Sequence, residues 1–160
     1  MAPQKTLDEL VSDPYVELVG LFLEAHRGLL ARLTTIHRAH GLQGSEFTCL
    51  LRLSRTPGQR LRMTDLAAQT GTSTSGITSI VERLLAQGLV ARDADPGDRR
   101  SLVVRLTEVG GERLSADLGQ LIPVLHGTIQ APLGSDHDSF TQALRRLRDV
   151  LNPNAAQRTP

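Results

Sequence analysis

Most of the chain consists of stretches in which apolar residues recur every three or four positions, the spacing of one face of an α-helix. The limits of these stretches are set by Gly or Pro breaks and by predicted N-cap residues, namely Ser45, Thr64, Ser73 and Thr107. They predict helices over residues 14–40, 45–55, 64–70, 107–126 and 136–151, and another within 72–89. Between residues 89 and 106 the pattern changes to two short β-prone runs. The sequence therefore predicts a mainly α-helical fold with one small β-hairpin.

The stretch from Thr72 to Leu89 has the clearest pattern. Its apolar residues form one stripe, at Ile77, Ile80, Val81, Leu84 and Leu85. The other side carries Ser75, Thr78, Ser79, Glu82 and Arg83. Ser73 is a suitable N-cap, and short polar side chains at a helix N-terminus let its free N–H groups approach an anion. Because a short helix at 64–70 and a turn at Gly71 come before it, this stretch is predicted to be the recognition helix of a helix-turn-helix.

The segment after Gly88 is predicted to be a hairpin. Its two β-prone runs, 89–92 and 101–106, are joined by the turn-forming residues Asp95 to Asp98. A hairpin directly after a recognition helix is a wing, and the tip of this one holds Arg99 and Arg100. An arginine there can reach the adjacent minor groove of DNA. The alternative is an ordinary solvated turn.

Two amphipathic helices flank this predicted core. The apolar face of the first contains Leu18, Phe22, Ala25, Leu29, Leu33 and Ile36, and that of the last contains Phe140, Leu144, Leu147 and Leu151. We expect the two helices to pack together, and against the same pair from a second copy, as a dimerisation layer. Such a dimer sets two recognition helices about 10 bp apart and favours an inverted-repeat site. The alternative for the first helix is burial within its own domain.

Composition narrows the function classes. The formal net charge is +1, so any DNA-binding charge must be local, and aromatic residues make up 2%, which disfavours a stacking platform for single-stranded nucleic acid. Lys5 is the only lysine among 18 Lys and Arg residues, which a GC-rich genome explains as well as selection for phosphate binding does. The single Cys excludes an intrachain disulfide, and neither a signal peptide nor a membrane-spanning segment is evident. We expect a cytoplasmic protein without contact to a membrane.

Three motifs carry a family resemblance: TDLAAQTG at 64–71, TSIVERLLAQGLV at 78–90 and DPGDRRSLVVRLTEVG at 95–110. In this order they are similar to the MarR family of bacterial winged helix-turn-helix regulators. The resemblance implies one MarR-like domain over residues 14–151, between a polar leader at 1–13 and a loose tail at 152–160. Its winged helix-turn-helix core would span about 42–107, and its dimerisation helices about 14–40 and 107–151.

The function that the resemblance implies is a sequence-specific, double-stranded DNA-binding transcriptional regulator. It would be a homodimeric repressor of an inverted-repeat operator, relieved by a small anionic or phenolic effector. The implied DNA contacts are Thr72, Ser73, Ser75, Thr78, Ser79, Arg83, Asp98, Arg99 and Arg100. Asp98 would orient the wing and Arg100 would enter the minor groove. Many members carry arginine at the position of Ser79, so base readout there is expected to be weaker or mediated by water.

The effector pocket of the family lies between the dimerisation layer and the winged core, where His26, Arg52 and Arg55 are candidate anion partners. Cys49 lies among apolar residues and is expected to be a buried, inert thiol rather than a redox sensor. A zinc site using His37 and His40 with Glu24, His26 or His126 is a lesser alternative, because no cluster with structural zinc spacing accompanies them. We expect no metal and no cofactor.

Two other function classes stay open. A winged helix can serve as a protein-docking module without specific DNA binding, in which case Arg99 and Arg100 would be dispensable. An enzyme would need a convergent set of Ser, His and carboxylate groups, or paired carboxylates in a pocket, and the sequence contains no recognisable motif of either kind. We therefore expect a regulator and not an enzyme.

Overall fold

The computed structural model describes residues 6–95 and 98–153, with only the backbone described for residues 98–101. The chain divides into two compact units, Met1–Thr35 and Ile36–Pro160. Helix α2 (Pro14–Ala39) crosses from one unit into the other.

The first unit holds α1 (Leu7–Val11) and most of α2. Residues 1–13 were predicted to be a polar leader, but α1 is a short helix with its own capping box. The Thr6 N–H donates to the Glu9 carboxylate at 2.8 Å, and the Glu9 N–H donates to the Thr6 hydroxyl at 3.3 Å. The long helix predicted from Pro14 is confirmed.

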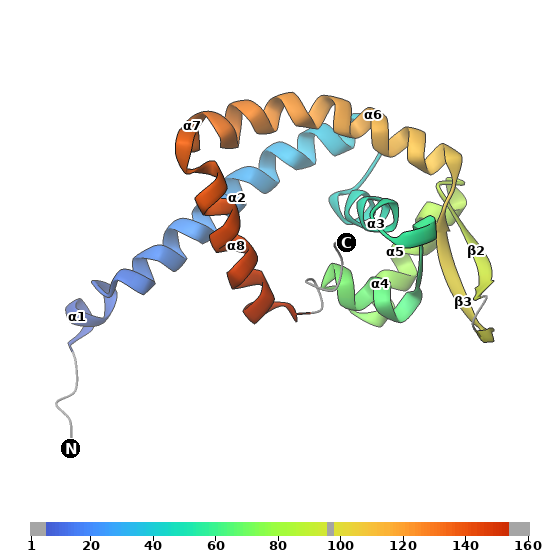
Figure 1. Cartoon of the computed structure of the whole chain (residues 1–160), viewed down its shortest axis with the longest axis horizontal. Helices are drawn as coiled ribbons and strands as arrows, with labels where there is room; N and C mark the ends of the chain where they lie inside the picture. Colours follow the sequence, from blue (N-terminus) through green and yellow to red (C-terminus); the bar gives the residue numbers. More distant parts are fainter. Residues whose placement is uncertain (1–5, 96–97, 154–160) are drawn as a thin grey trace, which may run out of the picture. The chain divides into compact units, whose positions relative to one another are not determined.

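In the second unit, the apolar core lies among the last turn of α2, α3 (Gly44–Ser54), α4 (Met63–Thr70), α5 (Thr74–Ala86) and α6 (Glu108–Leu125). Figure 1 shows α3, α4 and α5 gathered beside the β-hairpin. The almost fully buried apolar side chains come from α3, α4, α5, α6 and the strand residue Val104, and they include Leu50, Leu53, Leu66, Val81, Leu84 and Leu114. The apolar face predicted for the stretch 72–89 is thereby confirmed, apart from Leu85 at its edge.

Two predicted helix caps were wrong. Ser45 was expected to cap α3 and Thr64 to cap α4, but the N-cap positions are Gln43 and Arg62. At Gln43 the backbone N–H donates to the carboxylate of Glu46 at 2.8 Å, so a glutamate three residues along the chain satisfies this terminus. The caps predicted at Ser73 and Thr107 are confirmed, since each hydroxyl accepts a backbone N–H three residues further on.

A three-stranded antiparallel sheet carries the wing, in the order β1-β3-β2. The hairpin of β2 (Val90–Asp95) and β3 (Asp98–Leu106) was predicted, although both strands are longer than expected. The edge strand β1 (Arg60–Arg62) was not predicted. It follows the short 3-10 helix η1 (Pro57–Gln59) and pairs with β3 in the register Arg60 to Arg105. Three residues are too few to show a strand periodicity.

The chain after α6 stays helical for longer than predicted. The helix continues through the π-helical turn η2 (His126–Gln130) into α7 (Ala131–Leu133), where a break was expected. The break occurs at Gly134, whose φ of +50° ends the helix. The 3-10 turn η3 (Gly134–Asp136) then leads into α8 (His137–Leu151), as predicted from the apolar spacing.

Both flanking helices leave apolar side chains uncovered in the single chain. On α8 no residue is buried, and Val150 and Leu151 are 81% and 79% exposed. On α2 the only buried residue is His37, and the exposed ones include Tyr15, Leu18, Leu21, Phe22 and Leu30. Within the described part of the chain, no helix is both long enough and apolar enough to cross a membrane.

Candidate nucleic-acid interface

The turn between α4 and α5 sets the angle of the predicted recognition helix. Gly71 adopts φ +65° at the end of α4, a left-handed conformation that glycine reaches without strain. Two residues later Ser73 is the N-cap of α5, and its hydroxyl accepts the N–H of Gly76 at 3.1 Å. A methyl group at Gly76 would lie 2.8 Å from Thr72 Cγ2 and 3.1 Å from the Ser73 hydroxyl, so glycine leaves room for this cap.

Helix α5 separates its apolar and polar sides sharply. Ile77, Ile80, Val81 and Leu84 are buried, while Leu85, also predicted to be buried, is half-buried at the edge of the stripe. The opposite side exposes Ser73, Thr74, Ser75, Thr78 and Ser79. This exposed group is called the hydroxyl face below. It lies on the first two turns of α5, where N–H groups and the positive end of the helix dipole favour an anion.

The hydroxyl face can both donate and accept hydrogen bonds. Thr78 and Ser79 donate to the carbonyls of Thr74 and Ser75 at 2.9 and 3.3 Å, which leaves their oxygen lone pairs directed outward as acceptors. Ser73 and Ser75 lie 3.3 Å apart, oxygen to oxygen. Hydroxyl groups rotate easily, so the same side chains can turn to donate to a phosphate or a base edge. Thr72 is half-buried and its hydroxyl accepts from that of Thr70 at 3.1 Å.

Arg83 lies two turns beyond Ser75 on α5, and its guanidinium already makes hydrogen bonds within the protein. Nε donates to Glu46 at 2.9 Å, and Nη2 lies 3.4 Å from the side-chain oxygen of Gln43. The Arg83 side chain is 41% exposed, whereas that of Glu46 is 3% exposed. Arg83 was predicted to contact DNA. The structure gives it a buried partner on α3 and leaves part of its guanidinium in solvent.

The wing is tied to the rest of the second unit by ion pairs. Arg92 on β2 donates to Glu82 on α5 at 2.6 Å, and Arg62 on β1 pairs with Asp95 near the hairpin tip. An exposed pair such as Arg92–Glu82 contributes little stability, but it restricts where the hairpin lies relative to α5. The side chains predicted to contact DNA from the wing, those of Asp98, Arg99 and Arg100, lie outside the described residues.

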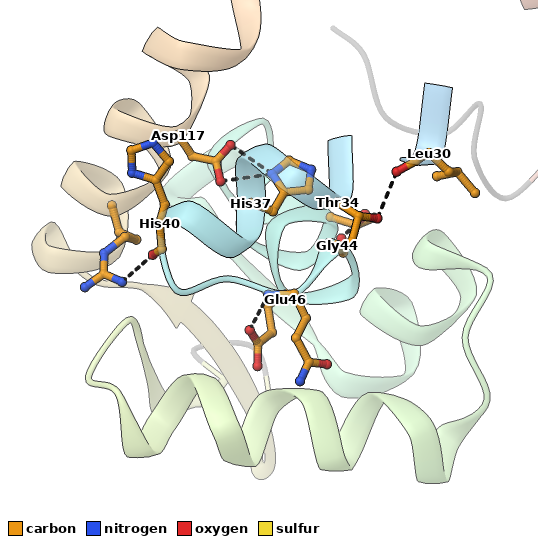
Figure 2. Close-up of polar contacts among 10 residues, drawn as sticks. Leu30, Thr34, His37, His40, Gly44, Glu46 and Asp117 are labelled. Carbon is orange, nitrogen blue, oxygen red and sulfur yellow. Dashed lines mark hydrogen bonds and ion pairs between the residues drawn. The ribbon is translucent and has the colours of Figure 1, made fainter. Parts of the chain in front are cut away.

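A buried polar pair that the sequence did not reveal lies in the same unit. His37 in the last turn of α2 and Asp117 on α6 are 2% and 0% exposed, and His37 Nδ1 is 2.9 Å from both carboxylate oxygens (Figure 2). The imidazole also stacks on Phe47, with the ring centroids 4.1 Å apart. Next to this pair, Arg113 donates to the carbonyl of His40 at 2.7 Å. These hydrogen bonds connect the last turn of α2 and the residue after it to α6.

The remaining predicted sites are placed as follows. Cys49 is fully buried, as predicted, and burial followed by the nearby Glu46 charge raises the pKa of its thiol to about 12, which disfavours the reactive thiolate. His37, a candidate zinc ligand, is buried and hydrogen-bonded through Nδ1 to Asp117. Among the described residues no three His, Cys, Asp or Glu side chains form a group able to hold a metal ion.

The three predicted effector residues do not all belong to one unit. His26 is exposed in the first unit, while Arg52 and Arg55 are in the second, at the end of α3. The Nε atom of Arg52 is buried without a hydrogen-bond partner. Burial lowers the pKa of Arg52, and the positive charges of Arg55 and Arg148 lower it further. Arg52 therefore lies close to two further positive charges, of which that of Arg148 is already paired with Asp149 at 2.7 Å.

Comparison with known proteins identifies the family that this chain resembles. A family model described as "MarR family" matches residues 40–101, from the end of the first long helix to the wing. The transcriptional repressor MprA of Escherichia coli is 28% identical over 141 residues, covering 87% of this chain and 80% of that protein. The crystal structure of AbsC, a MarR family regulator from Streptomyces coelicolor, superposes with a TM-score of 0.77 at 26% identity, covering 94% of this chain and 98% of that one. This chain therefore matches the MarR family over its winged core and resembles MarR-family proteins over most of its length.

The predicted fold, a winged helix-turn-helix with added helices, is thereby confirmed, and so is the predicted class of DNA-binding transcriptional regulator. A further MarR-family structure, Sco3205 from S. coelicolor in complex with DNA, shares this fold, with a TM-score of 0.77 at 24% identity over 96% of this chain and 93% of that one. Within the family framework, α5 is the recognition helix and the β2–β3 hairpin is the wing.

Proposed function

We propose that this chain is a homodimeric repressor that binds an inverted-repeat operator and releases it when a small anion binds. The observation that carries the DNA part is the hydroxyl face of α5, exposed on a helix whose other side is buried in the core. Ser73, Ser75, Thr78 and Ser79 would contact the major groove and its phosphates. The protein would act in the cytoplasm as a regulator and not as an enzyme.

The uncovered apolar side chains on α2 and α8 support the dimer. Monomeric proteins rarely expose so many large apolar residues on two helices, and a second copy of the chain would cover them. Two-fold symmetry would then place the two α5 helices about one turn of DNA apart, about 10 bp, which is why the operator should be an inverted repeat.

The wing is expected to supply a separate part of the DNA affinity. Arg100→Ala should weaken operator binding by about 1–3 kcal/mol, because an arginine in a narrow minor groove meets concentrated negative potential. The measurement is an equilibrium titration of labelled operator duplex at fixed salt. Arg38→Ala is the control, since it removes an equal charge from an exposed position at the end of α2. Equal affinity in the wild type and Arg100→Ala would contradict the minor-groove role and favour a docking module.

The arginines at the end of α3 support an anionic effector. A carboxylate beside Arg52 would offset the repulsion that Arg55 and Arg148 exert on it, and would supply an acceptor for its buried Nε. We expect benzoate or one of its hydroxylated derivatives to release the operator, and Arg52→Gln to raise the concentration needed by about tenfold or more. Arg60→Gln, an exposed arginine on β1, is the control. If none of these carboxylates releases the wild-type protein, or if Arg52→Gln responds like the wild type, the anion assignment is wrong.

A further inference from the structure

Glu46 is a carboxylate buried next to the predicted DNA-binding surface. It lies in the first turn of α3, and its side chain is 3% exposed. One oxygen accepts the backbone N–H of Gln43 at 2.8 Å (Figure 2), and the other accepts Nε–H of Arg83 at 2.9 Å. A buried charge persists only when it is paired and hydrogen-bonded. Each Glu46 oxygen therefore has its own partner. One caps the N-terminus of α3, and the other holds the Arg83 side chain of α5.

Arg83 lies on the same side of α5 as the hydroxyl face. Residues 75, 79 and 83 are four apart, so their side chains follow one another along the helix surface. The bond to Glu46 fixes the inner edge of the guanidinium, while the side chain as a whole is still 41% exposed. A guanidinium carries five N–H donors, so an arginine held through Nε has outer donors left for a phosphate. Fixing it in advance also reduces the side-chain entropy lost on binding.

We infer that Glu46 is a positioning residue for DNA binding, which holds the Arg83 guanidinium ready to receive a phosphate of the operator backbone. This inference rests on the proposed function, because it concerns the same surface. Glu46 does not touch the DNA in this account. It acts through Arg83, in the way that supporting groups orient the residues that make the contact.

For the Glu46→Gln variant, the positioning role and simple charge repulsion predict changes in DNA affinity of opposite sign. Glu46→Gln removes one negative charge from the neighbourhood of a polyanion, so repulsion alone predicts tighter DNA binding. The positioning role predicts weaker binding, by about tenfold, because the neutral amide holds Arg83 less firmly. Glutamine keeps the length of the side chain and an acceptor for the Gln43 N–H, so the cap of α3 is retained. Asp65→Asn, an exposed acid on α4, is the control, and it should bind equally or more tightly.

The test is a titration of the operator duplex at several salt concentrations with the wild type, Glu46→Gln, Arg83→Gln and the double variant. Loss of one phosphate contact reduces the slope of log affinity against log salt by about 0.9. We expect this reduction in both single variants, and no further loss of affinity when Glu46→Gln is added to Arg83→Gln. Urea unfolding of each variant shows whether the fold is kept, since a merely structural role would lower stability without changing the salt slope.

The outcomes separate this inference from the proposed function. Affinity equal to or above that of the wild type in Glu46→Gln, or an unchanged salt slope, would overturn the role of Glu46 while leaving operator binding intact. Additive losses in the double variant would also overturn it, because they would mean that Glu46 and Arg83 act separately. A wild-type protein that selects no DNA sequence would instead overturn the proposed function.

Discussion

Gly110→Ala is expected to lower the free energy of unfolding by about 3 kcal/mol, the upper part of the range for overpacked sites. A methyl group at position 110 would lie 2.0 Å from the carbonyl oxygen of Leu89 and 2.9 Å from Leu106 Cδ1. The first of these contacts is to a backbone atom, which cannot move away by rotation about a side-chain bond. That carbonyl accepts the Thr107 N–H at 3.2 Å, and the Leu89 N–H donates to Leu84 at 2.9 Å. Relief of the clash would therefore disturb the junction of α5, the wing and α6.

The neighbouring glycine provides the control. A methyl group at Gly111 would meet nothing within 4 Å, so Gly111→Ala should be neutral or stabilise the α6 helix by up to about 1 kcal/mol. Urea unfolding followed by circular dichroism measures both variants, at one protein concentration because the stability of a dimer depends on it. Equal stability of Gly110→Ala and Gly111→Ala would contradict the close approach of α6 to Leu89.

A chain that ends at Ser135, without α8, is expected to be monomeric at micromolar concentration and to bind operator at least about a hundredfold more weakly. The helix has no buried residue in the single chain, and it exposes Phe140, Leu147, Val150 and Leu151. Its removal should therefore spare the core of the winged domain while removing surface that the partner would cover. The DNA affinity falls because the second recognition helix no longer binds at high effective concentration.

Sedimentation measures the assembly, and titration with operator measures the affinity. A chain shortened only by residues 154–160 is the control and should behave as the full-length protein does. Leu147→Glu in the full chain is a milder variant, which should weaken the dimer without shortening the chain, because it places a charge in the proposed apolar contact. A truncated chain that stays dimeric would exclude α8 from the interface.

The parts of this fold that were predictable are those that periodicity encodes. The stripe from Ile77 to Leu84, the Ser73 and Thr107 caps and the hairpin around Asp95 each use a local rule, and the structure confirms them. In the hairpin, the local signal was a turn between two β-prone runs. The order of a short helix, a glycine turn, an amphipathic helix and a hairpin then indicated a winged helix-turn-helix.

The features that were missed depend on contacts between distant residues. Glu46 and Arg83 are 37 positions apart, and His37 and Asp117 are 80 apart, so no local pattern pairs them. The cap of α3 did have a local signal, since Gln43 and Glu46 have the spacing of a capping box, but Ser45 was the commoner cap residue and was preferred. The edge strand β1 forms only because β3 is there to pair with it.

The central claim is that this chain binds a specific duplex as a symmetric dimer through α5 and the wing. The most direct test is selection of bound duplexes from a random DNA library, read by sequencing, followed by titration of the selected site at two salt concentrations. The account predicts enrichment of an inverted repeat with half-sites about one helical turn apart, bound with a steep dependence on salt. Absence of any enriched sequence, with only weak binding that salt abolishes, would contradict it.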